Sequence, residues 1–205
     1  SAVATIEVTP QNDAPIANDT AARGAEDAAS IPVTLSGSDM DGSVASFTLG
    51  ALPTNGTLFL DAAHTQPVTP GTPIPAGTGG TTTLHFVPAP NWNGETRFPY
   101  TATDNDNLAS APAEARITVD SVNDAPVAND TAARGAEDAT SIPVTLSGTD
   151  PDGSVASFTL GTLPTNGTLY LDAAHTQPVT PGTPIPAGAS GTTTLHFVPA
   201  PNWNG

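Results

Sequence analysis

An internal repeat constrains the fold of this chain more than any other feature. The segment from Asn12 to Gly94 recurs from Asn123 to Gly205, an offset of 111 residues, and eight of the 83 aligned positions differ. The differences are mild, as where Phe59 becomes Tyr170. Because self-similarity at a fixed period marks a repeat array, both copies are expected to share one fold.

The same offset sets the frame of the chain, because residues 2–8 align with residues 113–119 at the end of a repeat. Residues 1–11 are therefore expected to be the last strand and linker of a preceding repeat. Residues 12–122 would form a complete repeat, and residues 123–205 a second one without counterparts of the last two strands. Open strand edges recruit other strands, so residues 2–8 are predicted to pair with a neighbouring molecule of an otherwise monomeric array.

Short alternating runs within the complete repeat predict half-buried strands, because apolar residues alternate with small polar ones and turn formers bound each run. With 22 Pro and 19 Gly, the chain has no room for long helices. We predict strands at residues 16–22, 31–36, 44–49, 57–60, 81–87, 96–103 and 113–119. About seven strands at this spacing predict an all-β fold of tandem immunoglobulin-like or cadherin-like β-sandwiches.

The alternation also predicts which side chains face the core. They are Val33, Leu35, Phe47, Leu49, Leu58, Leu60, Leu84, Phe86, Phe98, Tyr100, Ile117 and Val119. Between Leu52 and Leu58, the pair Asn55 and Gly56 predicts a tight hairpin, since both central residues of a type I′ turn need positive φ.

The charge balance excludes several classes of partner. Twenty acidic residues face four arginines and no lysine, which gives a formal net charge of −16. Such a chain is expected to bind neither nucleic acid nor anionic lipid. No apolar run reaches the roughly 18 to 20 residues that a bilayer-spanning helix needs, so no membrane insertion is expected. Without cysteines, no disulfide or thiolate metal site can stabilise the repeats.

The acidic residues gather in the turns. Asp39 and Asp41 stand two positions apart, as do Asp104 and Asp106, so in extended segments each pair projects to one side. Calcium accepts six to eight oxygens in irregular geometry and fits such loops better than magnesium or zinc. An EF-hand is excluded because its twelfth position, counted from Asp39, falls on Gly50. Asp-x-Asp-Gly is also a good turn sequence by itself, but four acidic groups per repeat with almost no cation favour a metal.

Several short motifs together resemble the cadherin-like tandem repeats of large secreted bacterial proteins, including the extender domains of repeats-in-toxin (RTX) adhesins. The motifs are Asn-Asp-Ala-Pro at 12–15 and 123–126, Glu-Asp at 26–27, Ser-Asp-Met-Asp-Gly at 38–42, Pro-Asn-Trp-Asn-Gly at 90–94 and Ala-Thr-Asp-Asn-Asp-Asn at 102–107. The resemblance implies that an Asp-rich loop, an acidic residue near the first strand and an Asn-Asp linker converge on Ca²⁺ at junctions of successive repeats.

The metal ligands that the residues and this resemblance imply are the following. They are Asn12, Asp13, Glu26, Asp27, Asp39, Asp41, Asp104, Asp106, Asn123, Asp124, Glu137, Asp138, Asp150 and Asp152. Asp104, Asp106, Asn123 and Asp124 would meet Glu26, Asp27, Asp39 and Asp41 of their own repeat, or the counterparts of these residues in the next repeat. Asp61 and Asp172 are expected to be ordinary turn residues.

The aromatic and histidine residues support no catalytic site. Trp92 and Trp203 could stack on a sugar, but an aromatic that plugs the end of a sandwich is the favoured interpretation. His85 and His196 are expected on a solvated strand face. No Ser, His and acid grouping suggests a triad, so an enzyme is not expected. The favoured function is a calcium-stabilised extender of a secreted bacterial surface adhesin whose partners are neighbouring repeats. The alternative is a glycan- or cell-binding module that acts by avidity.

Overall fold

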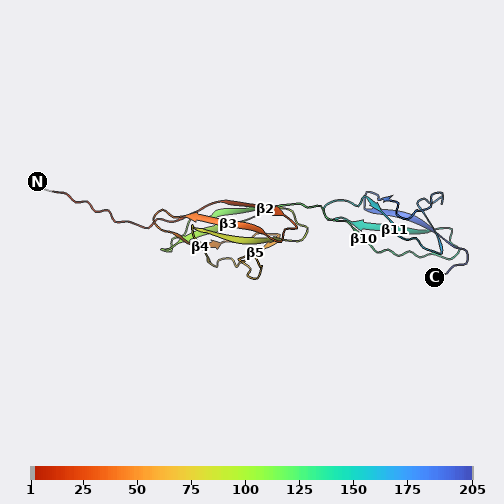
Figure 1. Ribbon diagram of the computed structural model, residues 1–205, viewed down its shortest axis with the longest axis horizontal. Helices are drawn as coiled ribbons and strands as arrows, with labels where there is room; N and C mark the ends of the chain where they lie inside the picture. Colours follow the sequence, from red (N-terminus) through yellow and green to blue (C-terminus); the bar gives the residue numbers. More distant parts are fainter. Residues whose placement is uncertain (1–2, 205) are drawn as a thin grey trace. The chain divides into compact units, whose positions relative to one another are not determined.

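All regular secondary structure in the described part of the chain is strand, which confirms the all-β prediction (Figure 1). This computed structural model describes residues 3–204. The chain divides into unit 1, residues 1–122, and unit 2, residues 123–205. Among the described residues, no helix is long and apolar enough to cross a membrane.

Unit 1 is a sandwich of two sheets whose strands all pair antiparallel except for one parallel pair, β2 with β9. The first sheet has the order β1 (Ile16–Ala17), β3 (Ile31–Ser38), β7 (Thr81–Pro88) and β5 (Gly56–Phe59). The second has the order β2 (Thr20–Ala25), β9 (Ala113–Asp120), β8 (Gly94–Asp104), β4 (Val44–Leu49) and β6 (Ile74–Pro75).

The core of unit 1 follows the two-residue period of its strands. On β3, Val33 and Leu35 are fully buried whereas Pro32 and Thr34 between and beside them are exposed, as pleating requires. Every side chain predicted to face the core is buried except Leu60, which is 39% exposed. That prediction was wrong because β5 ends at Phe59, and the Leu60 amide already donates to Gln66 O across the following loop.

The predicted hairpin at Asn55 and Gly56 was also wrong. Asn55 has a φ of 59°, but Gly56 has no positive φ and begins β5. The strands on either side do not pair, because β4 lies beside β8 and β5 lies beside β7 in the other sheet. Gly56 is needed for a different reason, since a Cβ there would lie 2.3 Å from Phe86 Cζ.

Unit 2 repeats the first sheet of unit 1. Its order is β10 (Val127–Asn129), β11 (Ile142–Thr149), β15 (Thr192–Pro199) and β13 (Gly167–Tyr170), with β12 (Ser157–Phe158) and β14 (Ile185–Pro186) as a separate pair. The register is the same, because Val144 faces Leu195 on β15 as Val33 faces Leu84 on β7. Residues 131–136, the counterpart of β2, form no strand and are exposed.

Residues 3–8 have no strand partner within the described chain. Residues 3–8 form no strand, and Val3, Ile6 and Val8 are each more than 85% exposed. Residue 2, the first of the predicted edge strand, lies outside the described residues. Pairing with a neighbouring molecule therefore stays a prediction.

Candidate functional site

The strand register of unit 1 brings two acidic loops to one end of the sandwich. Because β4 and β8 are antiparallel, the start of one meets the end of the other, and Val44 pairs with Asp104. Loop 38–43 therefore lies beside loop 104–107, and Asn105 N donates to Ser43 O at 3.1 Å. We call the polar side chains gathered here the carboxylate cluster. Its members are Asn12, Asp13, Asp39, Asp41, Asp104, Asn105 and Asp106.

Asp104 is the buried centre of the carboxylate cluster, with 1% of its surface exposed. Its carboxylate accepts hydrogen bonds from Asn12 Nδ2 at 2.8 Å, Asp106 N at 2.9 Å and Leu108 N at 2.8 Å. Burial by itself would raise the pKa of Asp104, but these hydrogen bonds outweigh it and hold the pKa below its ordinary value. Asp104 is therefore a fixed negative charge at neutral pH.

The loop of Asp39 and Asp41 supplies further oxygens to the carboxylate cluster. Asp41 accepts from Asp13 N at 3.2 Å, and Asn105 Oδ1 accepts from Ser43 N at 2.7 Å. Asp39 Oδ2 is buried and has no hydrogen-bond partner among the described residues. A Cβ on Gly42 would lie 2.8 Å from Asp39 Oδ2 and 2.6 Å from Asn105 Oδ1, so both oxygens close over that glycine.

Unit 2 reproduces the part of this arrangement for which it has residues. Asp152 Oδ1 accepts from Asp124 N at 3.2 Å, as Asp41 accepts from Asp13. Asp150 Oδ1 is buried without a hydrogen-bond partner in the described part of the chain. Asn123 Nδ2 donates to Asp124 O at 3.0 Å. The same loop thus carries an unsatisfied carboxylate oxygen in both units.

Glu26 does not lie in the carboxylate cluster, although the sequence analysis predicted that Glu26 and the cluster residues bind metal together. It follows β2, and its amide bonds to Asp120 O at the end of β9, beside the start of β8. Asp104 ends the 11 residues of β8, which span roughly 30 Å at the usual rise per residue. Glu26 is buried, and Oε1 accepts from Val122 N at 2.7 Å whereas Oε2 has no partner among the described residues.

The remaining predicted ligands are exposed. Asp27 and Asp138 lie at the surface, and Glu137 Oε2 accepts a 3.4 Å hydrogen bond from Asn204 Nδ2. Within residues 3–204, no three His, Cys, Asp or Glu side chains are arranged as a ready metal site. The cluster instead mixes carboxylates with amide and main-chain groups.

No arginine neutralises the carboxylate cluster among the described residues. Arg23 pairs with Asp120 at 2.7 Å and lowers the pKa of that carboxyl. Arg97 and Arg116 both contact Glu95 on the outward face of β8 and β9. The positive charges of unit 1 are therefore committed elsewhere, while the acidic side chains of the cluster share one end.

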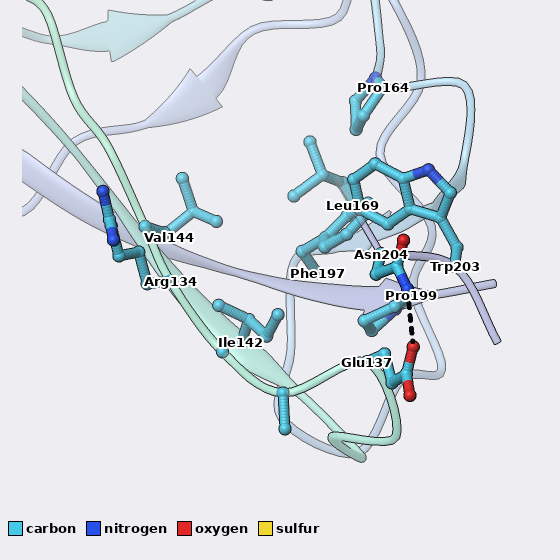
Figure 2. A pocket seen from close by; sticks show the side chains of 13 residues that line it. Arg134, Glu137, Ile142, Val144, Pro164, Leu169, Phe197, Pro199, Trp203 and Asn204 are labelled. Atoms are coloured by element: carbon cyan, nitrogen blue, oxygen red, sulfur yellow. Dashed lines mark hydrogen bonds between the residues drawn. The ribbon is translucent and has the colours of Figure 1, made fainter. Parts of the chain in front are cut away.

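Unit 2 has an apolar groove of about 830 Å³, seen from close by in Figure 2. Its walls include Ile142, Val144, Leu169 and Phe197, with Trp203 at one side. In unit 1, the residues equivalent to Ile142, Val144, Leu169 and Phe197 are at most 1% exposed. They lie in one buried cluster with side chains of β8 and β9. The groove is therefore the core face that β8 and β9 cover in unit 1, and it is not a polar ligand pocket.

Two turn predictions were confirmed. Asp61 accepts from Thr65 Oγ1, Thr65 N and Gln66 N, and these bonds, led by the Thr65 hydroxyl, lower its pKa. Asp172 does the same in unit 2.

Trp92 is partly buried and packs against the core of unit 1, as expected for an aromatic plug.

A family model described as the bacterial Ig domain matches residues 12–120. The chain belongs to the bacterial Ig-domain family. This membership supports the bacterial, immunoglobulin-like part of the resemblance and not the RTX extender type in particular. No curated protein matches the chain.

Solved structures similar to this chain include three of low sequence identity. The D00-D0 domain of intimin is 12% identical, with 93% of this chain and 88% of that chain covered and a TM-score of 0.32. Titin domains z1z2 in complex with telethonin are 13% identical, with 93% and 84% covered and a TM-score of 0.32. SGBP-B of Bacteroides ovatus, in complex with a mixed-linkage heptasaccharide, is 12% identical, with 92% and 50% covered and a TM-score of 0.23. The family assignment rests on the family model alone.

Proposed function

We propose that this chain is a structural spacer from the extender region of a secreted bacterial surface adhesin of the RTX type. In this proposal, Ca²⁺ binds to the carboxylate cluster of unit 1 and to its counterpart in unit 2. The ion stabilises each sandwich after export, because extracellular calcium sites typically bind at about 0.1–1 mM and would stay empty inside the cell.

The observation that carries the proposal is the unsatisfied carboxylate oxygen in the same loop of both units. Asp39 Oδ2 and Asp150 Oδ1 are each buried without a hydrogen-bond partner among the described residues. A buried carboxylate oxygen without a partner costs free energy, and in unit 1 the neighbouring charges of Asp41, Asp104 and Asp106 add repulsion. A bound cation would remove both penalties.

The donor chemistry favours calcium over other cations. The cluster offers carboxylates and the Asn105 amide oxygen, which are the hard oxygen donors that calcium accepts. In this proposal, Asp39, Asp41 and Asp104 draw together around the ion, because without it they are not arranged as a ready site in the described chain. Asn12 and the backbone amides of residues 106 and 108 keep Asp104 ionised and oriented. Magnesium demands stricter geometry, and zinc prefers nitrogen and sulfur.

The glycan-binding alternative receives less support from the aromatic side chains. A sugar platform needs an exposed aromatic face, but Trp92 packs against the core of unit 1. The most exposed large apolar side chains of the described units, such as Met40, are not aromatic. The spacer is therefore the preferred function, and no residue group supports a catalytic role.

Calorimetric calcium titration combined with thermal unfolding tests the proposal on the intact chain. We expect calcium to raise the melting temperature and EDTA to lower it. The double variant D39N/D41N should lose the unit 1 binding event and most of that unit's response. The matched control E95Q/E114Q removes two charges from the outward face of β8 and β9 and should respond like the parent chain. Identical melting in calcium and EDTA would overturn the proposal.

A further inference from the structure

Each unit holds two histidine rings in close contact, far along the chain from one another. His64 lies in the loop after β5, and its ring centroid is 6.4 Å from that of His85 on β7 and 5.3 Å from that of Phe59. In unit 2, His175 is 6.3 Å from His196 and 5.2 Å from Tyr170. The strand face predicted to be solvated at His85 is therefore covered, and His85 is half-buried.

The loop that carries His64 is fixed by Asp61. Its carboxylate accepts from Thr65 N at 3.0 Å, from Thr65 Oγ1 at 2.8 Å and from Gln66 N at 2.9 Å, and His64 N donates to Asp61 O at 3.1 Å. His64 consequently has a φ of 55°, in the left-handed region that non-glycine residues rarely adopt. Such a conformation persists only where the surroundings enforce it, and it turns the ring back over the sheet.

One nitrogen of each loop histidine is left without a partner. His64 Nε2 and His175 Nε2 are shielded from solvent and have no hydrogen-bond partner among the described residues. A buried imidazole nitrogen without a partner is costly. The carboxylate of Asp61 is already engaged, because its oxygens accept from Thr65 and Gln66.

The strand histidine of unit 2 is oriented by its own neighbour. Ser141 Oγ lies 3.2 Å from His196 Nδ1. When Nδ1–H donates to that hydroxyl, the lone pair of His196 Nε2 is left available. Histidines that bind metals are commonly held in this way, with the other ring nitrogen donating to an oxygen.

We infer that each unit binds a divalent transition-metal ion between its two histidines, and that Cu(II) binds more tightly than Zn(II). Metal–nitrogen distances of about 2.0–2.1 Å on both sides put two ring centroids roughly 5 to 6.5 Å apart, which includes the observed separations. Imidazole suits copper, nickel and zinc, and affinity rises toward copper. Water would complete the coordination. This site is separate from the carboxylate cluster and does not depend on calcium binding.

The test titrates the intact chain with Zn(II), and then with Cu(II), in a calcium excess that saturates the carboxylates. We expect the parent chain to bind two equivalents of metal, H64N to bind one and H64N/H175N to bind none over the same concentrations. The affinity of each altered site for the metal should fall at least tenfold. Asn tolerates positive φ, so the loops should persist. The control E95Q/E114Q should bind two equivalents. Equal binding by H64N/H175N and the parent chain would overturn the inference.

A second measurement covers the case in which the variants fail to fold. In the unaltered chain, nitrogen NMR of the four imidazoles should show the Nε2 signals of both loop histidines shift on addition of Zn(II). The signals of His85 and His196 should shift at the same stoichiometry, because each ion is shared by a pair. Histidine signals unchanged at two equivalents of Zn(II) would contradict the inference without any substitution.

Discussion

Asn12 Nδ2 donates a 2.8 Å hydrogen bond to Asp104 Oδ2, which ties the segment before β1 to the end of β8. Although burial opposes it, this bond and the backbone amides lower the pKa of Asp104 in the folded chain. A carboxyl with a lowered folded pKa stabilises the fold above its unfolded pKa of about 3.9 and stops doing so as the pH falls through the folded value.

Unit 1 should therefore lose stability in EDTA as the pH is lowered from about 5 toward 2. Asp61, Asp120 and Asp172 also have lowered pKa values, so the parent chain alone does not isolate Asp104. In D104N the acid dependence should be weaker, and stability at neutral pH should be lower. Denaturant unfolding at several pH values measures both. Parallel pH profiles for the two chains would contradict this assignment.

Gly56 should not tolerate even one added methyl group. A Cβ there would meet Phe86 Cζ at 2.3 Å and Val87 O at 2.6 Å. Because Phe86 is fully buried and cannot move freely, we expect G56A to destabilise unit 1 by about 2–3 kcal/mol. At Gly50 the nearest atom to a Cβ is Pro99 Cγ at 3.6 Å, so G50A should cost about 0.5 kcal/mol or less. Urea unfolding compares the two variants.

Period-two alternation predicted the longer strands, because their burial patterns follow directly from pleating, as on β3 and β9. The strand predicted at residues 16–22 was wrong, since the chain there forms two strands, β1 and β2, in different sheets. The alternation also missed β6, whose two residues are too short to show a period. Pairs such as Asp39 and Asp41 were visible in the sequence. Their meeting with Asp104, and the separation from Glu26, depend on how β4 and β8 pair, which no local pattern contains.

The histidine pairs were missed for a related reason. The position of His85 on its strand was predicted from alternation, but its contact with His64 requires a left-handed residue in a loop held by Asp61. The spacing of Asp61 and Thr65 was the one local signal, since an Asp side chain often bonds to backbone amides that follow it. That signal predicts a turn without giving the direction of the His64 ring.

The groove of unit 2 should accept a hairpin with the sequence of β8 and β9. In unit 1, Phe98, Tyr100 and Ile117 of these strands are at most 1% exposed and complete the core. A peptide of residues 94–120 added to the chain should raise the melting temperature of unit 2 and change the fluorescence of Trp203, which lines the groove. The peptide F98S/I117S should do neither, because burying two hydroxyls without partners is unfavourable.

Residues 3–8 should join molecules head to tail in solution. Ile6 and Val8 align with Ile117 and Val119, which are buried on β9, yet they are 87% and 86% exposed. In unit 1, β9 pairs in parallel with β2, and the β2 counterpart in unit 2, residues 131–136, has no strand partner in the described chain. An unpaired edge beside an apolar groove is a ready acceptor for such a strand.

Sedimentation velocity should therefore show a sedimentation coefficient that rises with concentration. I6D should abolish the rise, because it places a charge on the side of the strand that corresponds to buried Ile117. T5D carries the same charge on the side that corresponds to exposed Arg116, so it should associate like the parent chain. The peptide of residues 94–120 should compete with association, since both would occupy the core face of unit 2. A coefficient independent of concentration, or equal behaviour of I6D and T5D, would rule out strand exchange through residues 3–8.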